Sequence, residues 1–151
     1  IYDTFGDKHG LFLRSLEHYQ QTQSEGQEAT LEKTDSPKKK IHILFQTAIR
    51  EVLTDKKQTG CFMINVSAEL GCVDKDIATK ACEVIAVMED RLYHWIKEGQ
   101  AKGEITRKFP ARALARYLYN SFTGLKTNGK TRPDQDALKD IVKVTLAVLE
   151  D

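Results

Sequence analysis

The side chains that could do chemistry are spaced in a way that argues against an active site or a metal centre. None of the four histidines lies four residues from another, and none belongs to an H-E-x-x-H motif, which binds zinc from one face of a helix. They are His9, His18, His42 and His94. The sequence also has no glycine-rich phosphate loop and no G-x-S-x-G nucleophile motif. We therefore expect a protein that is not an enzyme and that uses no metal and no cofactor.

The cysteines fit a reducing compartment better than a disulfide framework. There are three, Cys61, Cys72 and Cys82, and no C-x-x-C pair occurs among them. An odd number without close pairs argues against disulfides and against a structural zinc site. We expect a cytoplasmic protein in which these residues are small buried hydrophobes. The alternative is a thiol sensor, which would need at least one exposed cysteine with a low pKa.

The composition indicates one globular domain with no strong electrostatic preference. The chain has 151 residues, of which 40% are hydrophobic and 30% charged, and a net charge of +1. A whole-chain preference for nucleic acid is therefore excluded, and any DNA contact would have to come from a local patch or from residues outside this sequence. No apolar run approaches the roughly 20 residues that a membrane span needs, so no membrane partner is expected.

Helical periodicity runs through most of the chain. We expect helices at 7–23, from Pro37 onward and at about 75–102, with Asp74 or a neighbour capping the last of these. The helix that starts at Pro37 has apolar residues at intervals of three and four, which predicts one buried face. These residues are Ile41, Leu44, Phe45, Ala48, Ile49 and Val52.

The remaining segments complete an all-α prediction. Apolar residues alternate over 62–70, but a lone strand has no partner for its edges, so a short helix is expected there. Gly103 should end the long helix, and Pro110 should open the next one. The stretch 126–134, KTNGKTRPD, is expected to turn the chain into a last helix that ends near Leu149.

The first residues resemble the end of a helix-turn-helix. IYDTFGDKHGLFLRSLEHY is similar to the segment of the TetR/AcrR family of transcriptional regulators in which a Y-x-x-F-G-x-K pattern closes the recognition helix. Here the pattern runs from Tyr2 to Lys8. GCFMINVSAELG and EGQAKGEI are similar to segments of one branch of the family, so the resemblance covers essentially the whole chain. Gly10 and Phe109 depart from it, at positions where the family often has Glu and Asp.

The resemblance implies a TetR-like all-α fold and a ligand-responsive DNA-binding regulator. Residues 1–6 would be the end of the helix-turn-helix domain, most of which would precede this sequence, and residues 7–151 would form the ligand-binding and dimerisation domain. The implied partners are operator DNA, an unidentified small-molecule effector and a second copy of the chain. Tyr2 and Lys8 would contact DNA phosphates, or Tyr2 would pack on Phe5 and Lys8 would be merely exposed.

An effector cavity is implied in the larger domain. It would be lined by Phe45, Phe62, Val66, Met88, Leu92, Trp95 and Phe122, with Asn65 and Tyr117 as its polar groups. For each of these residues, ordinary core packing is the alternative. Binding would shift the population of domain arrangements and tilt helix 7–23, and the spacing of the two recognition helices would change.

The last two helices carry wide apolar faces that either pack internally or meet a partner. We expect them to pair with a second copy as a four-helix bundle. The expected dimerisation residues are Leu118, Phe122, Leu125, Leu138, Ile141, Val142, Leu146 and Leu149. A repressor released by its effector is the leading hypothesis. Two alternatives stay open, namely a thiol-sensing regulator of the same fold and a ligand-free helical dimerisation module.

Overall fold

A computed structural model describes residues 10–11, 13–18, 21, 28–55, 69 and 73–151, and all structural statements below concern these residues. The chain divides into two compact units, 1–33 and 34–151. In the first unit, residues 10–11, 13–18, 21 and 28–31 are helical. The second unit contains α2 (Pro37–Thr54), α4 (Lys75–Ala101), α5 (Ala111–Thr131) and α6 (Gln135–Ala147). The described part of the chain contains helices and no strand, which confirms the all-α prediction.

Capping side chains set the helix starts where the sequence predicted them. Ser36 precedes Pro37, and its hydroxyl accepts a hydrogen bond from the Lys39 backbone N–H at 3.3 Å. Asp74 caps α4 by accepting bonds from the backbone N–H groups of Asp76 and Ile77 at 3.0 and 3.2 Å. Such caps satisfy backbone donors that have no partner inside the helix.

The helix ends follow the prediction at one place and depart from it at another. Gly103 has φ 74° and lies just after α4, where a left-handed residue favours glycine. The turn expected over 126–134 is wrong in extent, because α5 continues to Thr131 and only residues 132–134 connect it to α6. Gly129 is a buried helical residue packed against Val52 of α2, not a turn glycine. The last helix ends at Ala147, slightly before the expected Leu149.

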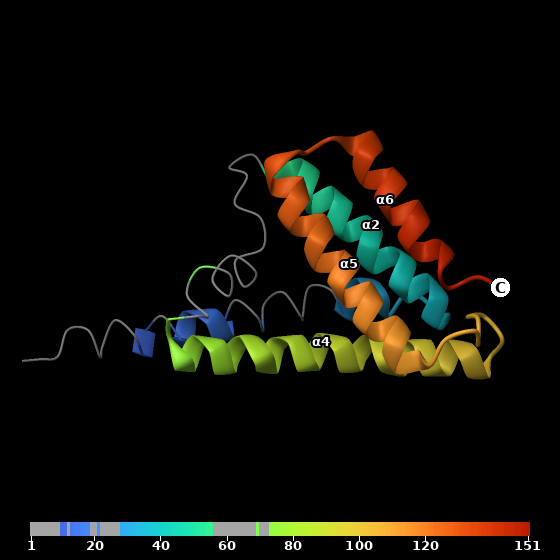
Figure 1. Cartoon of the computed structure of the whole chain (residues 1–151), viewed down its shortest axis with the longest axis horizontal. Coiled ribbons are helices and arrows are strands. Elements are labelled where there is room, and N and C mark those ends of the chain that lie inside the picture. The colour runs from blue at the N-terminus through green and yellow to red at the C-terminus, as the bar shows by residue number, and fades with distance from the viewer. Residues whose placement is uncertain (1–9, 12, 19–20, 22–27, 56–68, 70–72) are drawn as a thin grey trace, which may run out of the picture. The chain divides into compact units, whose positions relative to one another are not determined.

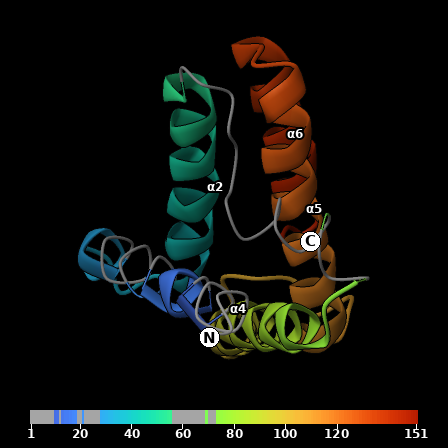
Figure 2. The same cartoon turned by 90° about the vertical axis from the view of Figure 1, so that its left-hand side faces the viewer.

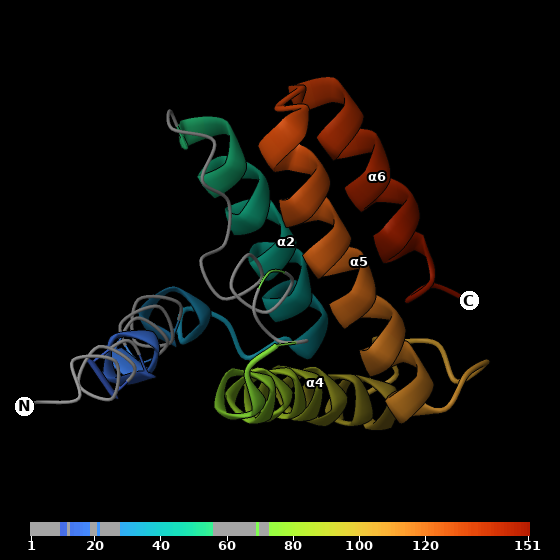
Figure 3. The ribbon, with the colours of Figure 1, turned by 60° about the vertical axis from the view of Figure 1, so that its left-hand side comes forward.

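The second unit packs α2, α5 and α6 side by side, with α4 lying across one end of α2 and α5 (Figure 1, Figure 3). Figure 2 looks along α4, with α2 on one side and the α5–α6 pair on the other. The core lies where α2, α4, α5 and α6 meet, and at its centre the rings of Phe45 and Phe122 pack edge to face, 5.8 Å apart. Within the described ranges, no helix combines the length and apolar character that crossing a membrane requires.

Candidate binding site

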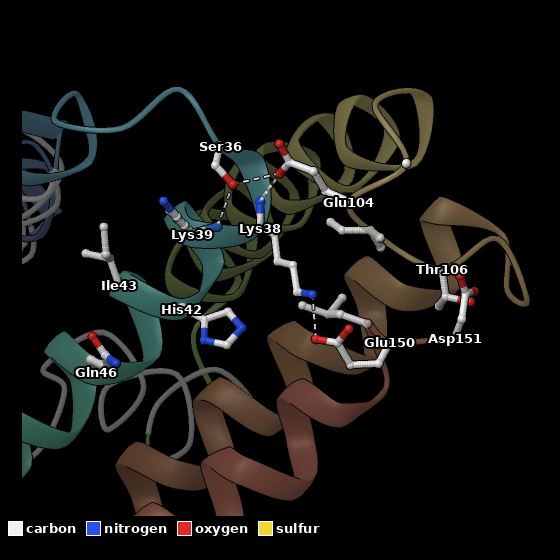
Figure 4. A pocket seen from close by; sticks show the side chains of 13 residues that line it. Ser36, Lys38, Lys39, His42, Ile43, Gln46, Glu104, Thr106, Glu150 and Asp151 are labelled. Carbon is white, nitrogen blue, oxygen red and sulfur yellow. Dashed lines mark hydrogen bonds and ion pairs between the residues drawn. The ribbon is translucent and has the colours of Figure 1, made fainter.

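An open hollow of about 880 Å³ lies where the start of α2 meets the α4–α5 connection and the C-terminal residues (Figure 4). Its walls come from Ser36 and the first three turns of α2, the connection 103–106 and residues 149–151. The volume is within the range of small-molecule sites. We therefore take this hollow, and the groove that adjoins it, as candidate binding sites in the described part of the chain.

A hydrogen-bond network already occupies the start of α2. The Ser36 hydroxyl donates to a Glu104 carboxylate oxygen at 2.7 Å, and the Lys38 backbone N–H donates to the same oxygen at 3.4 Å. These bonds, Ser36 first, lower the pKa of Glu104, and the charges of Lys102 and Lys38 act in the same direction. The helix N-terminus is thus occupied by a carboxylate of the chain itself and does not offer a free anion site.

The α4–α5 connection is fixed from two sides. The Thr106 backbone N–H donates to the Leu149 carbonyl at 2.8 Å, which ties the connection to the C-terminal residues. The Gln100 amide donates to the Thr106 carbonyl at 2.9 Å and to the Phe109 carbonyl at 3.0 Å. Gly99 leaves room for Ile105, because a Cβ there would lie 2.5 Å from the Ile105 Cδ1 atom. Hydrogen bonds to α4 and to the C-terminal residues therefore hold this wall of the hollow in place.

His42 is a titratable residue that lines both the hollow and the adjoining groove. Its ring is half-buried beside an ion pair in which Lys38 Nζ lies 2.5 Å from a Glu150 carboxylate oxygen (Figure 4). Its Nε2 atom is buried and has no hydrogen-bond partner among the described residues. Burial is the main cause that lowers the pKa of His42; the Lys38 charge also lowers it, and the Glu150 charge opposes the change. The neutral imidazole is therefore the favoured form near neutral pH.

This lowered pKa predicts a pH-dependent stability. In the unfolded chain, His42 takes up a proton around its ordinary pKa of 6.5, whereas the folded chain resists protonation to a lower pH. The free energy of unfolding should therefore fall as the pH drops from 6.5 toward the lowered folded pKa, with the full contribution present above 6.5.

Urea unfolding of the wild type and of His42→Gln at about pH 7.5 and about pH 5 checks this prediction. The variant should lose less stability than the wild type between the two conditions, because it lacks the titrating ring. Equal losses in both proteins would contradict it. Lys38 and Glu150 are present in both proteins, so the two proteins differ only in the side chain at position 42.

The expected effector residues divide into buried and accessible positions. Phe45, Leu92 and Phe122 lie in the core, exposed by 1%, 1% and 7%. Met88 and Trp95 are half-buried, and Tyr117 is 44% exposed. Phe62, Asn65 and Val66 lie outside the described residues. Neither the hollow nor the adjoining groove is lined by any of these residues, so the effector cavity among them stays a prediction.

The expected dimerisation residues are mostly inside the protomer. Seven of them have side chains exposed by 7% or less, because α5 and α6 turn these faces toward the core of the same chain. They are Leu118, Phe122, Leu125, Leu138, Val142, Leu146 and Leu149. Only Ile141 of the eight is exposed, by 42%, and the other large exposed hydrophobics of these two helices are Tyr117 and Val144. Pairing between copies stays a prediction, and Ile141 and Val144 of α6 are its surface candidates.

Of the remaining predicted site residues, only Cys82 is described by the structure, so only its predicted burial can be compared with it. Tyr2 and Lys8 lie outside the described residues, as do Cys61 and Cys72. Cys82 is exposed on α4, so its expected burial was wrong. Its exposure meets one of the two conditions for a thiol sensor. No group of histidine, cysteine and acidic side chains in the described ranges is arranged to hold a metal ion.

Sequence reasoning missed the network around Ser36, Glu104 and His42. Ser36 was recognisable as a helix cap, but its partner Glu104 is 68 residues away. The pairing of Lys38 with Glu150 joins residues that are still further apart in the chain. Among these residues, only the capping signal at the start of α2 is visible in the sequence.

Comparisons with known proteins find a matching family and two related regulators. Residues 37–145 match the family described as "Tetracyclin repressor-like, C-terminal domain". The chain is 30% identical to an "Uncharacterized HTH-type transcriptional regulator YezE" of Bacillus subtilis over 151 residues, covering 99% of this chain and 78% of that protein. It is 28% identical to the "HTH-type transcriptional repressor ComR" of Escherichia coli over 147 residues, covering 97% and 70%. No solved structure matches the chain significantly.

Proposed function

Because this chain belongs to the TetR family of helix-turn-helix transcriptional regulators, we propose that it is a repressor that leaves its operator DNA when a small molecule binds its helical domain. The observation that carries the proposal is the family match over residues 37–145, together with the alignment of nearly the whole chain with HTH-type regulators. The choice of repressor over activator is supported by the relative whose name calls it a repressor.

We assign DNA binding to the start of the chain, and effector binding and dimerisation to the rest of it. Residues 1–6 would be the last part of the DNA-reading domain, and Tyr2 and Lys8 would contact phosphates of the operator. Residues 7–151 would hold the effector and a second copy of the chain. Phosphate contacts fix the position of a protein on DNA, whereas contacts with base edges supply the specificity. The base-reading residues would therefore belong to the helix that precedes Lys8.

Burial suggests which of the expected effector residues a ligand would meet first. Met88, Trp95 and Tyr117 retain accessible surface, whereas Phe45, Leu92 and Phe122 are packed in the core. A ligand would contact the first group directly, and it would reach the second only by displacing core packing. A ligand that favours one arrangement of the domain shifts the population toward it, and a tilt of helix 7–23 would then change the separation of the two recognition helices.

The proposed dimer surface consists of the exposed apolar residues on the last helix. Ile141 and Val144 of α6 are exposed by 42% and 69%. Large exposed side chains of this kind are suited to pairing with the same helix of a second copy. An operator with two half-sites then requires the dimer, since each copy supplies one recognition helix.

DNA binding and oligomeric state test the proposal together. The full-length protein should bind DNA from upstream of its own gene specifically, with an affinity that falls steeply as salt rises. The double variant Ile141→Glu/Val144→Glu should sediment as a monomer and lose most of this binding. Val87→Glu is the matched control, because Val87 is 54% exposed on α4 and lies outside the proposed dimer surface. Absence of specific binding at any salt concentration would refute the operator proposal, and a dimeric double variant would refute the assigned surface.

A further inference from the structure

A groove of about 730 Å³ runs between α2 and α6 and shares His42, Gln46 and Glu150 with the hollow described above. Its floor is apolar and is formed by Ile49 of α2 and by Val142 and Leu146 of α6. The three floor side chains are exposed by 9%, 7% and 7%, so a thin strip of apolar surface faces the solvent between the helices.

The rims of the groove are basic at one end. Arg50 lies on α2, and Lys139 and Lys143 lie on α6 at a spacing of four residues, which places them on the same side of that helix. All three side chains are exposed. None of them forms an ion pair with another described residue, whereas Glu150, the acidic residue of the lining, pairs with Lys38.

The two ends of the groove differ in the charged residues that line them. The helices α2 and α6 run antiparallel (Figure 1), so Arg50 lies at the Lys139 end of the groove, and His42 lies at the Glu150 end. Beyond His42, the adjoining hollow is lined by Lys38 and Lys39 as well as by the carboxylates of Glu104, Glu150 and Asp151, and Lys38 pairs with Glu150. An anionic group would therefore be attracted mainly to the first end, where the charged lining residues are all cations.

We infer that this groove binds an amphipathic organic anion, with its negative head between Arg50 and the two lysines and its apolar body along the floor toward His42. Arg50, Lys139 and Lys143, which pair with no other described residue, supply the attraction for the head group, and a carboxylate is the chemistry that they recognise. Ile49, Val142 and Leu146 supply an apolar strip for the body. The volume of the groove fits a small molecule. The site is separate from the proposed effector cavity, because no residue expected in that cavity lines it.

Octanoate and octanol provide a matched pair of probes, since both are linear eight-carbon molecules and they differ in the charge of the head group. Calorimetric titration of the full-length protein should detect octanoate and should show octanol binding at least tenfold more weakly. Amide chemical shifts in a ¹H–¹⁵N spectrum should change at Gln46, Ile49 and Lys143 when octanoate is added. Changes confined to other parts of the chain would overturn the inference, even if octanoate bound.

Charge removal from the rim gives the decisive comparison. The double variant Arg50→Gln/Lys143→Gln should bind octanoate about tenfold more weakly than the wild type. Lys108→Gln is the control, because Lys108 is exposed and lines neither hollow. All the exchanged side chains are exposed, and unchanged circular dichroism would establish that the variants fold. Equal affinity of the double variant and the wild type, equal binding of octanol, or no octanoate binding at millimolar concentration would each overturn the inference. None of these results bears on operator binding, which is measured without octanoate.

Discussion

Replacing Phe45 with alanine is expected to lower the free energy of unfolding by about 3–5 kcal/mol. The Phe45 side chain is 1% exposed, and its ring packs edge to face on Phe122 at a centroid distance of 5.8 Å. Truncation removes the burial of the ring and leaves a cavity that the surrounding helices cannot fill completely. Guanidinium unfolding followed by circular dichroism measures the change, and the slope with denaturant should stay constant.

Phe109→Ala is the matched control for this substitution. Phe109 is 52% exposed, so the same chemical change should alter the free energy of unfolding by about 0.5 kcal/mol or less. A double-mutant cycle with Phe122→Ala isolates the ring contact, for which a coupling of about 0.5–1.5 kcal/mol is expected.

The result also decides between two roles for Phe45. A loss of less than about 1 kcal/mol would contradict core packing and would indicate that the ring lines a preformed cavity, as the effector hypothesis requires. A loss in the expected range would leave Met88, Trp95 and Tyr117 as the residues through which an effector makes its first contact.

Local signals in the sequence predicted most of the helical architecture. Ser36 and Asp74 are short polar residues directly before apolar periodic segments, and both cap helices in the structure. Gly103, just after α4, takes the left-handed conformation that is common where a helix ends. Each of these features depends on residues within one or two turns of each other, so composition and spacing are sufficient to reveal them.

The partners of each apolar face could not be predicted in the same way. Periodicity shows that Leu138, Val142 and Leu146 share a face of α6, but a buried face looks the same whether it meets α2 or a second copy. The side chains that remain outside, such as Val144, were distinguishable only when the packing of α6 was known. The Ser36–Glu104 bond and the basic groove also join distant parts of the chain, and no local spacing encodes them.

Asn128-Gly129 shows how a strong local signal can be overridden. The pair is typical of turns, and the segment around it was expected to be one, yet both residues lie in the last turns of α5. A Cβ at Gly129 would lie 2.5 Å from Cγ1 and 3.1 Å from Cγ2 of Val52. The glycine is therefore required by the close approach of α5 to α2, and not by a turn.

Gly129→Ala is consequently expected to destabilise the protein by about 1–3 kcal/mol, the usual cost of forcing an extra carbon into a packed interface. This result would be opposite in sign to the effect of helix propensity, because alanine is more favourable than glycine in a helix interior by about 0.5–1 kcal/mol. Gly124→Ala provides the control on the same helix, since a Cβ there meets nothing within 4 Å. That variant should gain up to about 1 kcal/mol.

Shortening Val52 to alanine should reverse the effect of Gly129→Ala. In a Val52→Ala background, the Cγ atoms that the new methyl group meets are gone, so Gly129→Ala should be neutral or stabilising there, as Gly124→Ala is in the wild type. Chemical unfolding of the two single variants and the double variant gives the coupling energy between the sites. If Gly129→Ala behaved like Gly124→Ala in the wild type, the close contact of α5 with α2 would be refuted at this position. A coupling of more than about 1 kcal/mol would instead establish that packing against Val52 decides the residue at 129.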